Sequence, residues 1–163
     1  DVMVFGLGPA EGMETAQIRP GVKDLTAVLD RVSLVSYLKT GGGKGYHVVL
    51  PCHPAAGWEA FHAFAKNTAK TLEAMWPDRY TSNVRKDRRN NRIFIDWMRN
   101  GRGATSIVPY SVRAREGAPV SVPIAWTELA TVTPNGISMA EALQRARGAD
   151  PWAGFFAIGQ RLK

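Results

Sequence analysis

The chain has 163 residues, 45% of them apolar and 21% charged, which is typical of one globular domain that buries a core. No apolar run approaches the ~20 residues of a membrane span, and no secretory signal pattern opens the chain, so membrane and secreted classes are not expected. The net charge of +7 favours a polyanionic partner, and the single cysteine, Cys52, excludes an internal disulfide and indicates a reducing compartment.

The first half of the chain alternates between strand and helix patterns. Val2–Phe5 is an apolar strand that ends at Gly6-Leu7-Gly8, and the two glycines leave one face of an extended segment without side chains. The following elements are predicted as helix 14–31, broken or restarted at Pro20-Gly21, strand 34–40, a glycine-rich turn that leads into a strand ending at 51, and helix 57–76.

The helix over 57–76 has the clearest apolar face, formed by Trp58, Phe61, Ala65, Ala69, Leu72 and Met75. The second half is predicted as strand 92–100, its hairpin partner 103–111, an extended arm 116–126, a short helix start at Thr127 and Glu128, and helix 138–148, with Ser138 as N-cap and Glu141 completing a capping box. These elements predict an α+β (α/β) fold with a mixed central sheet flanked by helices.

Two glycine motifs resemble phosphate-binding loops but lack the defining residues. The Gly6-Leu7-Gly8 segment has Glu11 where a dinucleotide-binding fingerprint needs glycine, and Lys44 of the 41–45 segment is followed by Gly45 instead of Ser or Thr. The 41–45 segment still suits an anion, because glycines let backbone N–H groups converge and Lys44 adds a charge. The alternative is a flexible surface hairpin.

The candidate polar residues each have a structural alternative. His47, Cys52 and His53 match no zinc spacing and are expected to be packing or turn residues. Asp96 is a carboxylate within an apolar strand, which suits either a salt bridge to Arg99 or Arg113 or a hard-cation ligand. The 85–92 segment, "RKDRRNNR", is either a solvated basic loop or a nucleic-acid contact.

Three blocks carry a family resemblance: "VMVFGLGPAEG" (2–12), "KTGGGKGYHVVLP" (39–51) and "RIFIDWMRNGRGATSIVPYSVRAREGAPVSVPIAWTEL" (92–129). They resemble the polymerase module of bacterial ATP-dependent DNA ligase D, in the archaeo-eukaryotic primase superfamily. The resemblance extends over nearly the whole chain and implies a primase-polymerase, RRM-like catalytic core. Because the family module is about twice this length, residues 1–163 are expected to form one partial domain that resembles its C-terminal half, and Asp1 to be a cut or processed end.

The resemblance also assigns residues to a site. The family binds two divalent cations, Mn²⁺ or Mg²⁺, through three aspartates; Asp96 matches the third, whereas Gly6 and Gly8 replace the pair and Gly41 replaces a serine. The nucleotide-contacting positions map to Gly41, Gly42, Gly43, Lys44, His47 and Arg113, and basic or polar family positions near the triphosphate map to Lys86, Arg89 and Arg99. Magnesium held by Asp96 alone would bind weakly.

The resemblance implies a module of non-homologous end joining that adds nucleotides to DNA 3′ ends, with reduced catalysis in this chain. Its expected partners are DNA ends, NTP or dNTP, a Ku-like end-binding protein and the ligase and nuclease modules of a parent protein, in the bacterial cytoplasm at the nucleoid. The alternative is a non-catalytic module, or degenerate paralogue, that binds DNA ends or nucleotides through Lys44, the 85–92 segment and Arg113.

Overall fold

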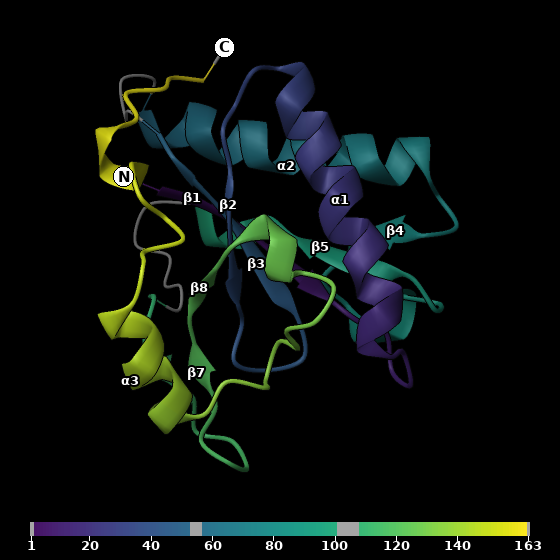
Figure 1. Ribbon diagram of the computed structural model, residues 1–163. Helices are drawn as coiled ribbons and strands as arrows, with labels where there is room; N and C mark the ends of the chain where they lie inside the picture. Colours follow the sequence, from purple (N-terminus) through teal and green to yellow (C-terminus); the bar gives the residue numbers. More distant parts are fainter. Residues whose placement is uncertain (1, 53–56, 101–107, 163) are drawn as a thin grey trace.

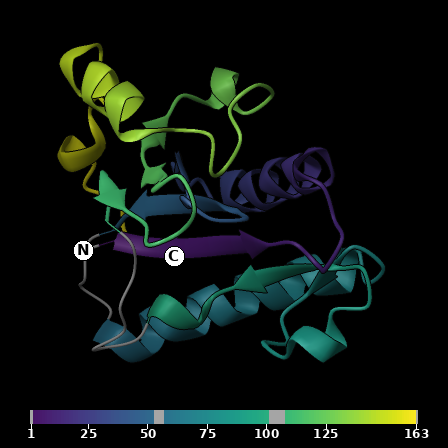
Figure 2. The same cartoon turned by 90° about the horizontal axis from the view of Figure 1, so that it is seen from below.

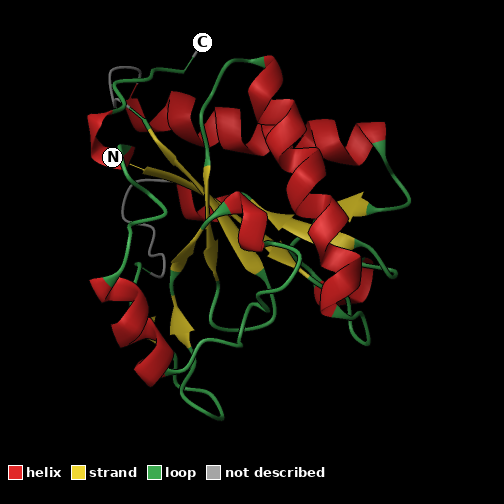
Figure 3. Ribbon diagram, in the orientation of Figure 1, coloured by secondary structure: helices red, strands yellow, loops and turns green. Residues whose placement is uncertain are grey.

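The computed structural model describes residues 2–52, 57–100 and 108–162 (Figure 1). The helices, red in Figure 3, are α1 (Thr15–Arg31), α2 (Gly57–Met75) and α3 (Met139–Arg147). The strands are β1 (Val2–Gly8), β2 (Tyr37–Thr40), β3 (Tyr46–Pro51), β4 (Tyr80–Thr81), β5 (Ile93–Asp96), β6 (Ser111–Val112), β7 (Val120–Ser121) and β8 (Pro123–Ile124). Short 3₁₀ turns are η2 (Lys86–Arg88), η3 (Met98–Asn100), η4 (Trp126–Glu128) and η5 (Phe155–Ala157).

The central sheet has the strand order β4-β5-β1-β3-β2-β8. Its inner four strands pair antiparallel and are connected as β1-α1-β2-β3-α2-β5, which is the βαββαβ arrangement of ferredoxin-like and RRM-like folds. β4 joins the far edge parallel to β5, so the sheet is mixed. The expected α+β class and RRM-like core are therefore confirmed.

The two faces of the sheet have different roles, as the alternation along β1 shows. Met3, Phe5 and Leu7 are buried in the main core together with the apolar faces of α1 and α2, so both helices cover the same face. Val4 packs on the other face with Trp152 and Phe155 from the C-terminal segment. The even positions beyond Val4 on this second face are the two glycines, Gly6 and Gly8.

Helix α1 is continuous, so the predicted break at Pro20-Gly21 is wrong. Pro20 lies on the exposed side of the helix, where its ring meets solvent. Gly21 is buried: a Cβ there would lie 3.1 Å from Ile93 Cδ1 and 3.2 Å from Leu7 Cδ2. The glycine thus allows the helix to approach the sheet closely, and this packing outweighs the lost hydrogen bond of the proline.

Helix α2 confirms the 57–76 prediction, and Phe61, Ala65, Ala69 and Leu72 are buried as expected. Trp58 and Met75 do not complete that face, because each lies in an end turn and is about two-fifths exposed. None of the described helices is long and apolar enough to cross a membrane. Helix α3 begins as predicted at Ser138, whose hydroxyl accepts a hydrogen bond from Glu141 N at 3.2 Å.

Strand β5 is shorter than the predicted strand 92–100. It ends at Asp96, whose Oδ1 accepts from Met98 N at 3.0 Å and starts the turn η3. The predicted pairing with 103–111 is wrong, because β5 lies between β4 and β1. Within that range, residues 103–107 lie outside the described part, and Ser111 belongs to β6, which pairs with β7.

Asn100 continues the hydrogen bonding of β1 where β5 stops. Its buried side-chain amide accepts from Val4 N at 2.7 Å and donates to Val4 O at 2.8 Å, as a neighbouring strand would. We expect Asn100→Ala to lower the free energy of unfolding by about 2 kcal/mol or more, because two buried backbone groups lose their partners. Urea unfolding measures this.

Asn67→Ala on the exposed side of α2 is the matched control, with an expected change within about 0.5 kcal/mol. Equal stabilities of the two variants would contradict a structural role for the Asn100 amide.

Candidate functional site

Four residues on adjacent strands form a row across the open face of the sheet. In the register of the sheet, Lys39 of β2 is opposite His47 of β3, and His47 is opposite Gly6 of β1. Gly6 is in turn opposite Asp96 of β5. Directly opposite positions in an antiparallel pair project to the same face with Cβ atoms about 5 Å apart. The register therefore brings together residues from all three family-like blocks.

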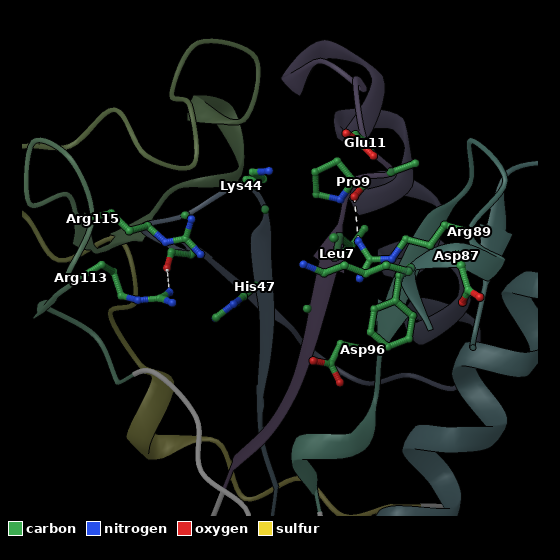
Figure 4. Close-up of a pocket in the computed structure, with 18 residues that line it drawn as sticks. Leu7, Pro9, Glu11, Lys44, His47, Asp87, Arg89, Asp96, Arg113 and Arg115 are labelled. Carbon is green, nitrogen blue, oxygen red and sulfur yellow. Dashed lines mark hydrogen bonds between the residues drawn. The ribbon is translucent and has the colours of Figure 1, made fainter. Parts of the chain in front are cut away.

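Three residues of this row, Gly6, His47 and Asp96, line a cavity of about 770 Å³ at one end of the sheet (Figure 4). Of the predicted site residues, Gly6, Gly8, Gly41, Gly43, Lys44, His47, Lys86, Arg89, Asp96 and Arg113 line it. Gly42 and Arg99 are not part of the lining. Arg89 approaches from the side of β5, whereas Arg113 and Arg115 approach from the opposite side, with the glycine strand end between them.

The glycine-rich turn 41–45 uses its own amides internally and makes room for Arg113. The amides of Gly41 and Gly42 donate to Gly45 O at 3.0 Å and Pro134 O at 2.9 Å, so these two groups are not directed at an anion as the sequence suggested. Arg113 Nη1 donates to Gly41 O at 2.6 Å. A Cβ at Gly42, where φ is +71°, would lie 2.5 Å from Arg113 Cγ, so glycine here makes room for the arginine.

Gly45 is needed for close packing of the turn against β1. A Cβ at this position would lie 1.9 Å from Leu7 O, a distance that no side chain can occupy. A Cβ at Gly41 would lie 2.4 Å from Gly45 O, so a serine at 41 would also require a different turn. The turn is therefore built around glycine at both ends.

Lys39 is buried behind His47 and determines how the imidazole is presented. Lys39 Nζ lies 2.8 Å from His47 Nδ1 and donates to Ser121 Oγ at 3.0 Å. Burial, and then the charge of Arg113, lower the pKa of Lys39 to about 7. Burial, and then the charges of Lys39, Arg113 and Arg99, lower the pKa of His47 to about 3. The imidazole is therefore neutral at physiological pH, and when Lys39 Nζ donates to Nδ1 the ring proton lies on Nε2.

The cavity does not fit a two-cation site. Two ions about 4 Å apart need several carboxylate oxygens, and no cluster of three or more His, Cys, Asp or Glu residues that could hold an ion occurs in the described ranges. Asp96 is the one carboxylate of the row. Glu11 also lines the cavity but lies on the opposite side of it, beyond Pro9. Asp87 forms an ion pair with Arg85 at 2.8 Å.

The sequence interpretation missed Lys39 and Arg115. Lys39 had a detectable signal, since a lysine alternating with apolar residues in a strand shares a face with Tyr37 and, through pairing, with His47. Arg115 lies in an irregular segment, and a Cβ at Gly43 would be 3.1 Å from its Cζ. No periodic pattern could place that arginine.

The pH dependence of the free energy of unfolding, compared between the unmodified chain and Lys39→Met, tests whether Lys39 is buried with a lowered pKa. The pKa of lysine falls from 10.5 when unfolded to about 7 when folded, so between these values the unfolded chain binds a proton that the folded chain has released. The free energy of unfolding of the unmodified chain should therefore rise with pH across this window relative to Lys39→Met, by an amount on the order of a few kcal/mol. Urea unfolding at about pH 6.5 and about pH 9.5 measures this; a constant difference would contradict it.

Comparisons with known proteins identify the family of the chain. Residues 1–152 match the family model of the LigD primase-polymerase domain. The chain is 34% identical to the multifunctional non-homologous end joining protein LigD of Pseudomonas aeruginosa over 99% of its length and 20% of that protein. It is 34% identical over 91% of its length to the LigD non-homologous end joining DNA repair protein of Mycobacterium tuberculosis, again covering 20% of that protein.

A solved structure is also similar: the polymerase domain from Mycobacterium tuberculosis ligase D in complex with DNA. It superposes with a TM-score of 0.87 at 32% identity, over 97% of this chain and 55% of the solved one. The chain thus spans about half of that solved domain and about a fifth of the curated relatives. On this basis the chain belongs to the LigD primase-polymerase domain family.

Proposed function

We propose that this chain is a polymerase-type module of bacterial end-joining repair that binds a DNA end and a nucleoside triphosphate. We further propose that its nucleotidyl transfer is strongly impaired. The observation that carries the proposal is Gly6 opposite Asp96 inside a cavity lined by cations. The cavity has the charge to hold phosphates, but it lacks the carboxylates that a two-metal reaction requires.

Three side chains of the cavity are suited to contact the phosphate groups of a nucleotide. Arg113, fixed by its bond to Gly41 O, supplies a guanidinium that is suited to bidentate contact with phosphate. His47 is neutral and, through its contact with Lys39, offers an Nε2–H donor that also suits a phosphate oxygen. Lys44 is exposed at the turn and adds a mobile positive charge. These groups orient an anion without carrying out a proton transfer themselves.

A divalent cation supplies charge neutralisation and an activated 3′ oxygen in polymerases of this kind. This chain offers Asp96 alone at the expected position, and a side chain at Gly6 would fit there, since its Cβ would lie 3.4 Å from Asp96 Cβ. We propose that the Asp-to-Gly changes, and not a changed fold, account for the impairment. The proposal also extends to bacterial cytoplasmic location and to Ku-like, ligase and nuclease partners, as expected for the family.

The metal deficit is tested by manganese binding. We expect the double variant Gly6→Asp/Gly8→Asp to bind Mn²⁺ at least about tenfold more tightly than the unmodified chain, because it adds two carboxylates on the face of the sheet that carries Asp96. The loss of the free-ion signal in electron paramagnetic resonance measures this. Gly148→Asp/Gly159→Asp adds the same charge away from the cavity, at positions with room for a side chain, and should leave affinity unchanged.

Impaired transfer has its own measurement. In a primer-extension assay with manganese, the unmodified chain should show no extension above background. Extension by this chain would refute the proposed impairment.

In the manganese-binding experiment, equal affinity of the two double variants would refute the proposed position of the missing carboxylates.

DNA binding is tested by its dependence on salt. Lys86 and Arg88 are exposed, and neither forms an ion pair among the described residues, whereas Arg85 is paired with Asp87. We expect the affinity for duplex DNA ends to fall steeply with salt, and Lys86→Ala/Arg88→Ala to reduce the slope of log K against log salt by about 2. Lys23→Ala/Lys70→Ala, on the exposed sides of α1 and α2, is the control. Equal slopes for both variants would exclude the 85–92 segment from the interface.

A further inference from the structure

Arg89 is held in a fixed position over the end of β1. Its Nη1 donates to Pro9 O at 2.8 Å (Figure 4), and its guanidinium lies 5.0 Å from the centre of the Phe94 ring. Phe94 is the residue opposite Gly8 in the β1–β5 pairing. The backbone carbonyl and the aromatic ring thus fix the position of this cation.

The position of Arg89 is adjacent to the missing carboxylate. A Cβ at Gly8 would lie 3.4 Å from Arg89 Nη1 and 3.8 Å from Nη2, so an acidic side chain there would pair with the guanidinium. With glycine at position 8, that pairing is absent. Arg89 Nε is buried without a hydrogen-bond partner in the described part of the chain. Burial lowers the pKa of Arg89 and Asp96 opposes this, but a guanidinium remains charged at neutral pH.

The glycines at positions 6 and 8 also make the net charge of the cavity lining more positive than acidic residues there would. Lys44, Lys86, Arg89, Arg113 and Arg115 carry positive charge, against Glu11, Asp87 and Asp96. Two carboxylates at positions 6 and 8 would cancel the positive charge that these residues leave. A cavity with no net charge would need bound cations to attract a polyphosphate. Without the two carboxylates, the lining residues that the structure describes keep an excess of two positive charges.

We propose that this cavity binds the polyphosphate group of a nucleotide without a divalent cation, and that Arg89 provides a fixed positive charge beside Gly8. The inference rests on the proposed function, since it takes the cavity to be the nucleotide site. It assigns Arg89 as a binding residue and defines the ligand as a metal-free polyphosphate. It also accounts for Gly8, which leaves Arg89 without an acidic side chain at that position and accessible from the cavity.

The test uses the full chain, inorganic triphosphate as the probe and isothermal titration calorimetry in excess EDTA. We expect binding in EDTA, and replacement of EDTA by magnesium should strengthen it less than about threefold. Arg89→Met should weaken metal-free binding at least about tenfold, the loss of one charge-assisted contact. Arg31→Met, with the same charge change at the exposed end of α1, should leave binding within about twofold.

A second variant keeps the test independent of any folding defect in Arg89→Met. Gly8→Asp retains Arg89 but pairs it with a carboxylate, so it should also weaken metal-free binding at least about tenfold. Binding that requires magnesium, or that is unaffected by both variants, would overturn this inference and leave the nucleotide site of the proposed function in place. No binding of triphosphate with or without magnesium would overturn both.

Discussion

The register of β1 between its two neighbours is the constraint on which the site depends. β1 pairs with β3 on one side and β5 on the other, and both registers meet at Gly6. A slip of one residue in either pairing would turn His47 or Asp96 toward the helices and bring core residues to the open face. The register is fixed because Met3, Phe5 and Leu7 must stay buried against α1 and α2. The core therefore also positions the polar groups of the site.

Two glycines in a central strand are unfavourable in themselves, because glycine loses more backbone entropy than other residues and offers no side chain to pack. At Gly6 and Gly8 the structure shows no steric need for glycine, since a Cβ at either would make ordinary contacts. Gly45 and Gly21 are different, because a Cβ at each would approach neighbouring atoms too closely. The glycines of the turn and of α1 thus serve packing, whereas those of β1 change the charge of the cavity.

The sequence predicted the fold well where periodicity was strong. The strands around His47 and Asp96, the helix over 57–76 and the Ser138 cap all follow from local patterns, and the family-like blocks indicated that Gly6, Lys44 and Asp96 belong together. Strand ends and partners were less predictable, because the Asp96 turn and the Asn100 bridge depend on side-chain hydrogen bonds. Alternation along the strand assigns Lys39 to one face, but its contact with His47 also requires the register, which no local pattern encodes.

The pairing of Gly6 with Asp96 affects the order in which the parts of the site form during folding. These partners are 90 positions apart in the chain, whereas Lys39 and His47 belong to one hairpin and are 8 apart. Distant pairings form slowly because the entropy of closing the intervening segment must be lost before the contact contributes. The hairpin can therefore assemble early, but the acidic side of the cavity exists only once nearly the whole domain has folded. Partly folded chains would carry the lysine and histidine of the hairpin without the aspartate on the other side of Gly6.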